Sequence, residues 1–546
     1  MLTTVLILII VIMIIPLILF FFFFNYDKNQ RQHSILRNYP VLGRIRYLLE
    51  HTGPEFRQYL FDGDTQGKPF SRNDFLSIIF PSKYLETIIS FGSKKDFEQK
   101  GYFLKNTLFP KLMEEMKIDN QFALKTKYYK TKEETLFKRK ETFTDKQVKP
   151  WLLHNENVVI MGEKTCEYPF QVKGLIGMSG MSYGSLGENS IEALSKGLGM
   201  AGGTWMNTGE GGISDYHLAG DVDIIMQIGP AKFGVRTDSG ELDWEELKLK
   251  GSIQQIKAFE LKLGQGAKIR GGHLPAEKNT PTIAKARKIE PYTTVESPNS
   301  FEEFRDLSSM FDFIDKIRKT TGKPVGIKMV IGDDTELHSF AKYMKETGRG
   351  PDFITVDGGE GGSGATYQEM ADSMGLPIKS AIMITHSVLK HYGIRDRVKI
   401  IASGKLFTSD KIAIALSMGA DLVSMARAYM IVIGCIGAQH CHKNTCPVGV
   451  ATTNPKLQKA LVIEDKKYRV ANFMITLRQG LFTLAAAAGL DSPTKFNSSH
   501  VVYKDDSGRI TRLKDIEKDI NHSVSLYQKD LDETISTNTD QQKLSG

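Results

Sequence analysis

Three of the four cysteines in the chain lie within twelve residues, in the segment CIGAQHCHKNTC. Cys435, Cys441 and Cys446 have the spacing C-x5-C-x4-C, and His440 and His442 flank the middle cysteine. Zinc is one candidate, because cysteine and histidine can complete its four ligands, although the usual C-x2-C and H-x3-H pairs are missing. Three thiolates on a short loop also suit a three-iron iron-sulfur cluster. The segment predicts a metal or cluster site and leaves both alternatives open.

A lysine and two glycine-rich segments indicate a second chemical group. Lys328 lies in the apolar run GIKMV, and burying an unpaired ammonium is costly, so its side chain is expected to reach water, an anion or a cofactor. It could simply extend to solvent at the end of a strand. Alternatively, it could face an electron-rich ring that holds negative charge when reduced. The clustered glycines of NTGEGG and DGGEGGSGA indicate backbone held close to a ligand.

Two further segments, SGK at residues 403–405 and SMAR at residues 424–427, favour a phosphorylated cofactor. In a (β/α)8 barrel the loops after strands seven and eight often bind phosphate through backbone amides and a helix N-terminus. Gly404, Ala426 and Arg427 are placed to do this. Each piece alone is equally consistent with an ordinary turn.

A third group of residues suits an anionic substrate. Lys268 and His273 lie in QGAKIRGGHLP, Arg287 follows, and Glu210 comes from NTGEGG. Arginine grips a carboxylate bidentately and lysine adds a second positive point, which fits a dicarboxylate. Taken singly, each is also explained as an ordinary surface charge.

The elements that must position these residues alternate between strand and helix from about residue 170. Strands are predicted within 174–180, 205–207, 324–331, 352–359, 398–404 and 421–427, and helices over 188–201, 300–322, 334–348, 380–393 and 409–419. The helix over 300–322 is expected to begin with a capping box of Ser300 and Glu303 and to end on Gly322. This alternation predicts an α/β fold, a (β/α)8 TIM barrel, whose chemistry lies at the carboxyl ends of the strands.

The N-terminus predicts a membrane anchor. The first 24 residues carry no charged side chain and would form a helix of roughly 35 Å, enough to cross a hydrocarbon core of about 30 Å. A cleaved signal peptide would need a basic start and a small-residue cleavage site, which are absent. Lys28, Arg31 and Arg37 follow the span, so a single-pass cell-membrane protein with a cytoplasmic catalytic part is expected. Disulfides are then unlikely.

Four parts are predicted along the chain. They are a transmembrane anchor (1–25), a small leading or wrapping region (26–150), the barrel with its cysteine loop (151–480), and a C-terminal extension (481–546) whose polar tail after about Asn521 is expected to be disordered. The formal charge of +8 comes partly from the lysine-rich residues 125–149, which suit either a negatively charged lipid surface or a solvated face. No nucleic-acid module or base-stacking pattern is present.

Together, CIGAQHCHKNTCPVGVAT, NTGEGG, QGAK, DGGEGGSGA and GADLVSMARAYM strongly resemble the flavin-binding synthase domain of glutamate synthase, in the family's order and over roughly residues 170–455. With its apolar start and the segment HSILRNYPVLGRIRYLLEH, the chain resembles the stand-alone FMN-binding glutamate synthase family proteins of bacteria. The resemblance implies FMN at the barrel mouth and a 3Fe-4S cluster on Cys435, Cys441 and Cys446. It also implies hydride transfer from reduced FMN to the imine of 2-oxoglutarate and ammonia, which is glutamate biosynthesis.

The resemblance also assigns roles to residues. Glu210, Lys268 and Lys328 are the implied catalytic residues, and Glu210, Lys268 and Arg287 the implied substrate contacts, with His273 in place of the family's glutamine. The implied FMN-binding set is Met178, Ser179, Ser182, Gln227, Lys328, Gly358, Gly359, Gly361, Gly362, Gly404, Ala426 and Arg427.

The expected partners follow from two departures. Complete glutamate synthases begin with a glutaminase domain whose nucleophile is an N-terminal cysteine, but no cysteine precedes Cys166, and no second Gly-rich dinucleotide domain is seen. Free ammonia or another amine, and an external electron donor such as ferredoxin or a reductase subunit, are therefore expected. The alternatives are the same chemistry on another keto acid or amine, such as N-alkyl glutamate synthesis, or a membrane-tethered electron-transfer protein.

Overall fold

A computed structural model describes residues 2–119, 122–135, 137–269 and 271–520, without the side chains of residues 2–11 and 13. The tail predicted to be disordered after Asn521 lies outside these residues. The chain divides into two units, residues 1–76 and 77–546, which are described separately.

The first unit is helical. It contains α1 (Leu2–Asn29), α2 (Ser34–Asn38), α3 (Gly43–Phe56), the short η1 (Arg57–Phe61) and the start of α4 (Arg72–Ile79). The fully buried Asp27 carboxylate accepts from Arg44 at 2.6 Å and from the Val41 amide at 2.9 Å. This bonding fixes the end of α1 to α3.

The predicted membrane span is not confirmed. No helix in the part of the chain whose side chains are described is long and apolar enough to cross a membrane. Within that part the apolar run of α1 extends from Ile14 to Phe24, roughly 16 Å of helix, whereas a hydrocarbon core is about 30 Å thick. On this finding the predicted single-pass membrane location is wrong, and the predicted transmembrane anchor over residues 1–25 and the predicted membrane partner are not supported.

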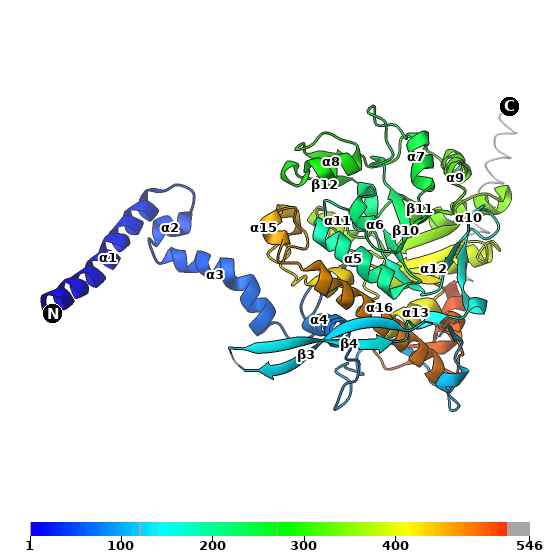
Figure 1. The fold of residues 1–546 in the computed structure, drawn as a ribbon, viewed down its shortest axis with the longest axis horizontal. Coiled ribbons are helices and arrows are strands. Elements are labelled where there is room, and N and C mark those ends of the chain that lie inside the picture. The colour runs from blue at the N-terminus through cyan, green and yellow to red at the C-terminus, as the bar shows by residue number, and fades with distance from the viewer. Residues whose placement is uncertain (1, 120–121, 136, 270, 521–546) are drawn as a thin grey trace. The chain divides into compact units, whose positions relative to one another are not determined.

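The second unit is built on a closed, all-parallel barrel, as the strand and helix alternation predicted (Figure 1). Its eight strands close in the order β10-β11-β14-β15-β16-β17-β8-β9. They are β8 (Ile176–Met178), β9 (Trp205–Asn207), β10 (Asp223–Ile228), β11 (Ile256–Lys262), β14 (Val325–Met329), β15 (Phe353–Asp357), β16 (Lys399–Ser403) and β17 (Leu422–Met425). Nearly all of their residues are buried, as expected when helices cover the outside of a parallel sheet.

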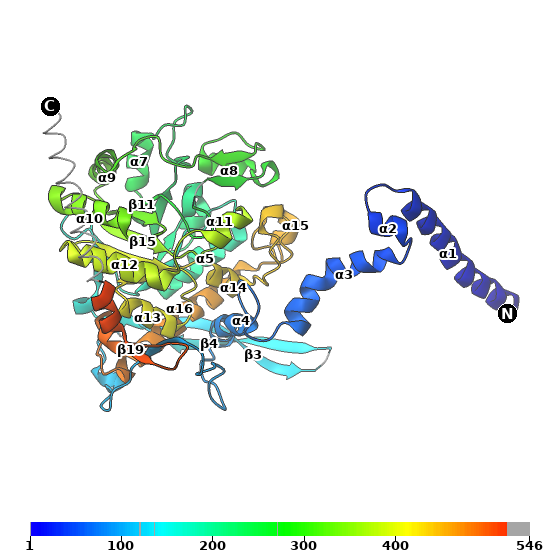
Figure 2. The same ribbon diagram turned by 180° about the vertical axis from the view of Figure 1, so that it is seen from behind.

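Helices surround the barrel in both views (Figures 1 and 2). They are α5 (Glu188–Ala201), α6 (Asp215–Leu218), α7 (Trp244–Gly251), α9 (Leu307–Thr321), α10 (Thr335–Thr347), α12 (Ile378–His391), α13 (Ser409–Ser417) and α14 (Arg427–Ile433). An insertion after β11 contains β12 (Gly272–Leu274), α8 (Pro281–Arg287) and β13 (Val295–Ser297), and α11 (Gln368–Ser373) follows β15.

One helix start differs from its prediction. The helix expected from Ser300 begins instead at Leu307, where the Asp306 carboxylate accepts from the Ser309 amide at 2.8 Å. Glu303 is not a capping residue but forms an ion pair with Lys232 at 2.7 Å. The predicted end is correct, because Gly322 adopts the left-handed conformation that closes the helix.

Segments outside the barrel pack against the long helix α16 (Ile463–Ala487). The buried Arg478 on α16 donates to the backbone carbonyls of Pro150, Ala201 and Gly202. The lysine-rich residues form the hairpin β3 (Leu124–Glu134) and β4 (Arg139–Val148), which Asn472 anchors through Thr126 and Lys127. The smaller strands are β1 (Gly101–Leu104), β2 (Ile118–Asp119), β5 (Leu152–Leu153), β6 (Val159–Met161), β7 (Phe170–Val172), β18 (Val501–Lys504) and β19 (Ile510–Arg512).

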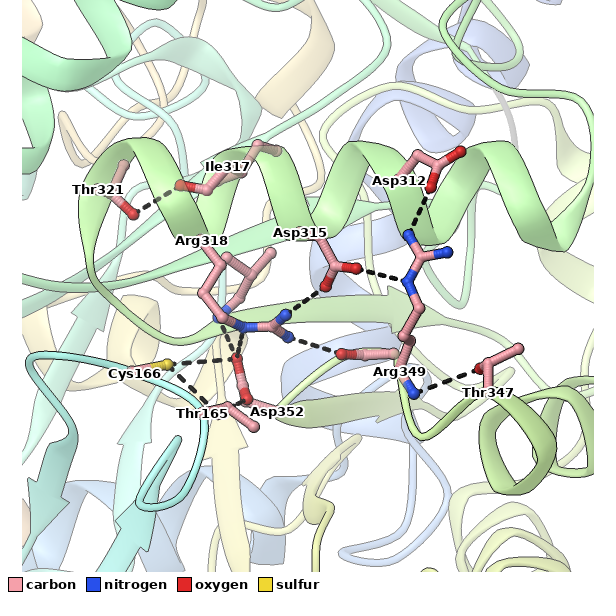
Figure 3. Close-up of polar contacts among 12 residues, drawn as sticks. Thr165, Cys166, Asp312, Asp315, Ile317, Arg318, Thr321, Thr347, Arg349 and Asp352 are labelled. Atoms are coloured by element: carbon pink, nitrogen blue, oxygen red, sulfur yellow. Dashed lines mark hydrogen bonds and ion pairs between the residues drawn. The ribbon is translucent and has the colours of Figure 1, made fainter.

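Asp352 organises the amino ends of the barrel strands (Figure 3). Its buried carboxylate accepts from the Arg318 guanidinium at 3.1 Å, from the Val325 amide at 2.8 Å and from the Thr165 hydroxyl, and the Cys166 sulfur lies 3.7 Å away. Burial and this carboxylate raise the pKa of Cys166 to about 11. The fourth cysteine is therefore a protonated thiol in a structural network.

Replacing Asp352 with alanine is expected to lower the free energy of unfolding by at least about 2 kcal/mol, because Arg318 Nε and the Val325 amide, two buried donors, lose their acceptor, although Arg318 keeps its ion pair with Asp315. Urea unfolding followed by circular dichroism measures this. The control, Asp312→Ala, removes an exposed carboxylate that pairs with Arg349 and should cost at most about 1 kcal/mol. Equal losses in the two variants would show that Asp352 has no special role.

Candidate functional site

The carboxyl ends of β9, β11 and the segment after β11 bring one carboxylate and two ammonium groups together. Glu210 lies in the short helix η5 (Gly209–Gly211) after β9, and its Oε1 accepts from Lys262 Nζ at 2.8 Å and from Lys268 Nζ at 3.4 Å. Lys262 is the last residue of β11 and stands opposite Lys328 in the parallel register. All of these side chains are largely buried.

The local charges set the protonation states of this group. Burial alone would raise the pKa of Glu210, but Lys262 and Lys268 outweigh it and lower the pKa to about 2. Burial lowers the pKa of Lys262 to about 8, against the opposing effect of Glu210. Glu210 is thus an ionised carboxylate near neutral pH. Lys262 is an ammonium at neutral pH and can give up its proton when the pH rises slightly above neutral.

Arg287 on α8 adds a third cation. Its guanidinium lies 5.0 Å from the centre of the Phe233 ring and donates one long hydrogen bond, 3.3 Å, to the Tyr183 carbonyl. Its Nε atom is buried and has no hydrogen-bond partner among the residues that the structure describes. Burial lowers the pKa of Arg287 to about 10, and only the Glu210 charge opposes this. A buried guanidinium with an unused donor is a binding group for an anion.

His273 is the predicted substrate residue that the structure does not bring into this group. It lies on the exposed face of the β12–β13 hairpin, and its Nδ1 lies 2.5 Å from Glu296 Oε1 in the paired strand. Gly272 beside it is close to Lys268, since a Cβ added there would lie 3.3 Å from Lys268 Nζ. The hairpin therefore covers Lys268 with backbone, and the imidazole faces away.

Lys328 reaches the barrel interior at the next strand. Its Nζ donates to Ser179 Oγ at 3.2 Å and lies 3.4 Å from Asp357 Oδ2, and Ser179 Oγ lies 3.1 Å from Ser403 Oγ. Two predicted cofactor residues, Lys328 of β14 and Ser179 just after β8, thus form one hydrogen-bonded group with Ser403 of β16.

The glycine loop after β15 is joined to the QGAK segment. The Gly266 backbone amide donates to Asp357 Oδ2 at 2.9 Å, and the Gln265 side-chain Nε2 donates to the Gly362 carbonyl at 2.7 Å. The Gly358 amide donates to the Ser403 carbonyl at 2.8 Å. Arg427 extends across the loop and donates to the Glu360 carbonyl.

The remaining predicted cofactor residues also lie at the strand ends. Met178 ends β8, Ser182 Oγ lies 2.9 Å from Ser185 Oγ in the following loop, and Ala426 precedes α14. Gly404, at a φ of +154°, follows β16 directly. The side-chain Nε2 of Gln227 already donates a hydrogen bond to Glu260 Oε1, at 2.7 Å, inside the barrel.

The three clustered cysteines form one loop after α14. Asn444, in the left-handed conformation, closes the loop by accepting from the Thr453 amide at 2.8 Å and the Thr452 hydroxyl at 3.0 Å. The Cys435 thiol has a pKa raised to about 11 by burial and by the neighbouring Cys441 and Cys446, despite a donor from the Gly437 amide. All described cysteines are free thiols. The loop therefore brings Cys441 and Cys446 close enough to Cys435 to affect its pKa.

The geometry bears on the zinc alternative and on the position of the fourth cysteine, Cys166. Within the described ranges no three His, Cys, Asp or Glu side chains are grouped closely enough to hold a single metal ion, so a zinc site gains no support. Cys166 contacts Asp352 at the amino end of β15, whereas the cysteine loop follows the carboxyl end of β17. Cys166 is thus at the opposite end of the barrel.

Sequence reasoning did not identify Lys262. The signal was available, because FELKLG is an apolar run that ends in lysine before QGAK, just as GIKMV surrounds Lys328. The strand β11 was not predicted, so its final lysine was not considered.

Comparisons with known proteins show what the chain is similar to. Residues 112–491 match the conserved region in glutamate synthase. The chain is 54% identical over 490 residues to the glutamate synthase large subunit-like protein YerD of Bacillus subtilis, covering 90% of this chain and 93% of that one. It is 34% identical over 298 residues to the archaeal-type glutamate synthase (NADPH) of Thermotoga maritima, of which it spans about half, 55%. A solved structure, a mutant flavocytochrome b2 with pyruvate bound, aligns with 84% of the chain at 11% identity and a TM-score of 0.39.

Proposed function

Since the chain belongs to the glutamate synthase family, we propose that it is an FMN- and iron-sulfur-dependent oxidoreductase that reductively aminates 2-oxoglutarate to glutamate. Ammonia or another amine supplies the nitrogen, and an external electron donor, such as ferredoxin or a reductase subunit, supplies the electrons.

The charge balance of the pocket carries this proposal. Three cations, Lys262, Lys268 and Arg287, surround the single carboxylate of Glu210, which leaves two positive charges unmatched. Lys328 does not change this balance because it pairs with Asp357. A dicarboxylate dianion neutralises the excess, and the unused Arg287 donor can bind one of its carboxylates.

The residues at the carboxyl ends of the barrel strands fit FMN. Arg427 and the backbone amide of Gly404 after β16 are donors of the kind that bind phosphate, and Lys328 would hold negative charge on the flavin ring. The proposed set remains the twelve residues from Met178 to Arg427 named above. Bound FMN would supply hydride transfer to the substrate.

The cysteine loop fits an iron-sulfur cluster. Cys435, Cys441 and Cys446 provide three free thiols on one closed loop, and thiolates are the ligands of such clusters. The cluster would supply one-electron transfer between the external donor and the flavin.

The pocket residues have separate roles in this proposal. Arg287 and Lys268 bind the two carboxylates of the keto acid. Lys262 Nζ donates a proton to the 2-oxo oxygen as water leaves, and Glu210 holds Lys262 and Lys268 in place. The β12–β13 hairpin covers Lys268 and limits the access of water.

A pH dependence follows from the Lys262 role. Because the pKa of Lys262 is lowered to about 8, kcat/KM for the keto acid should fall as the pH rises above about 8 and the proton donor is lost. Steady-state rates measured between about pH 6.5 and 9.5 test this. Lys262→Met should remove the alkaline decline together with most of the activity.

The matched control for this test is Lys257→Met. Lys257 lies on the same strand but is half-exposed and pairs with Asp223, so the decline should persist. A rate that is constant to about pH 9.5 in the unaltered protein would exclude Lys262 as the acid.

The cofactor content tests the proposal as a whole. Protein purified under anaerobic conditions should show a flavin absorption spectrum and about three irons per chain. The reduced protein should be reoxidised by 2-oxoglutarate with ammonium. Colourless protein containing zinc would contradict the proposal, and bound cofactors without substrate-dependent reoxidation would favour an electron-transfer protein.

One observation favours a second candidate, the same chemistry on another keto acid or amine. His273 stands where the family has glutamine, and it pairs with Glu296 instead of lining the pocket. Reoxidation by a panel of keto acids, each with ammonium or methylamine, distinguishes the candidates, since the preferred pair should react fastest.

A further inference from the structure

Lys278 is a buried lysine that the reaction as described does not use. It ends the short helix η6 (Ala276–Lys278), which lies between β12 and α8 in the chain, and only 3% of it is exposed. Its Nζ donates to the backbone carbonyls of Cys441 at 3.1 Å, Ser185 at 3.3 Å and Ala451 at 3.4 Å. An amine with three acceptors uses three N–H donors, and lysine has three only when it is protonated. The group beside Cys441 is therefore a buried ammonium, even though burial lowers the pKa of Lys278 to about 8.

The three acceptors belong to separate parts of the site. Cys441 lies in the cysteine loop, Ala451 lies just after it, and Ser185 contacts Ser182 in the loop after β8. Lys278 itself is followed by Asn279, whose side chain donates to the Glu290 and Thr293 carbonyls around α8. One ammonium thus joins the cysteine loop to the loop of a proposed flavin ligand and to the helix that carries Arg287.

The positive charge also acts on the sulfurs. Lys278, Cys441 and Cys446 are close enough for their charges to interact, and burial limits the screening of that interaction by water. A cation near a cluster stabilises the reduced form, which carries one more negative charge.

We propose that Lys278 is a positioning residue of the cysteine loop, and that its positive charge raises the reduction potential of the cluster held by Cys435, Cys441 and Cys446. This inference rests on the proposed function. It places the control of electron entry in the segment that also carries the substrate residue Arg287.

The test is a redox titration of the full chain, prepared anaerobically and followed by electron paramagnetic resonance. At the midpoint of the unaltered protein, the ratio of reduced to oxidised cluster should fall at least tenfold in Lys278→Met, which is about 59 mV for one electron. Lys278→Arg keeps the charge and should change the ratio less than about threefold. The control Lys443→Met removes an exposed lysine near Cys441, where solvent screens the charge, and should also change it less than threefold.

An unchanged ratio of reduced to oxidised cluster in a Lys278→Met protein that retains three irons would overturn this inference and leave the proposed function intact. If the Lys278→Met variant binds no iron, Lys278→Gln is measured in its place, because glutamine keeps two N–H donors without the charge. An unchanged reduction potential in Lys278→Gln would also overturn the inference. Loss of iron from both neutral variants but not from Lys278→Arg would support the positioning role. Unaltered protein that contains no iron would contradict both the proposed function and this inference.

Discussion

Replacing Arg287 with alanine should raise the KM for the keto acid by about 30-fold or more, with a smaller effect on kcat. Removing one partner of a buried, hydrogen-bonded charge pair costs at least about 2 kcal/mol, and 1.4 kcal/mol is a tenfold change in affinity. Arg287 is buried and has an unused Nε donor, so the dianion would lose its main carboxylate contact. Initial rates at varied 2-oxoglutarate concentration, with reduced donor and ammonium in excess, measure this change.

The matched control is Lys285→Ala on the same helix. Lys285 is exposed, and its removal subtracts the same unit of charge without touching the pocket, so KM should stay within about twofold because solvent screens exposed charges. A KM in Arg287→Ala equal to that of the unaltered protein would exclude Arg287 from substrate binding. Equal increases in both variants would mean that the effect is only long-range charge.

If the proposed cluster is present, replacing Cys441 with serine should reduce the iron content from about three per chain to less than about one, because serine lacks the thiolate that would bind it. The flavin spectrum should remain, since the proposed flavin-binding residues lie at the carboxyl ends of the barrel strands and none of them is in the cysteine loop. Iron analysis and visible absorption of protein purified anaerobically give both quantities.

Cys166→Ser provides the control within the same chain. Cys166 contacts Asp352 at the other end of the barrel, so this variant should retain both iron and flavin. Iron retained in Cys441→Ser, or lost from Cys166→Ser, would contradict the assignment of the three-cysteine loop.

The barrel could be predicted because its outer helices and strands have strong local patterns. Residues 188–201 show regular helical spacing and form α5 over those bounds, and the apolar runs around Lys328 and Asp357 are strands as expected. The start of α9 could not be predicted from capping residues alone. Phe301 and Phe304 stack at 5.0 Å and pack on Phe313, and this tertiary packing holds the segment before Leu307 outside the helix.

The candidate site was predicted only in part for a related reason. The glycine loops and the cysteine spacing are local signals, whereas Lys262 becomes significant only when β11 places it beside Glu210. His273 has the right position in the sequence, but the alternation of a two-stranded hairpin turns its side chain toward Glu296. The roles of all these residues stay predictions until they are measured.

The membrane prediction relied on composition rather than on structure. An uncharged N-terminal run is a strong compositional signal, but the apolar part of α1 whose side chains are described is too short to span a bilayer. The buried Asp27–Arg44 pair further along the unit could not be foreseen from the same pattern.

The measurement that tests the central claim most directly is a single anaerobic turnover. Protein reduced chemically and then freed of reductant is mixed with 2-oxoglutarate and nitrogen-15-labelled ammonium, and the products are identified by mass spectrometry. The account predicts labelled glutamate, about one molecule for each two electrons lost from the protein, and little product with monocarboxylic keto acids because the pocket holds two unmatched positive charges. Flavin reoxidation without labelled amino acid, or equal turnover of mono- and dicarboxylic keto acids, would contradict it.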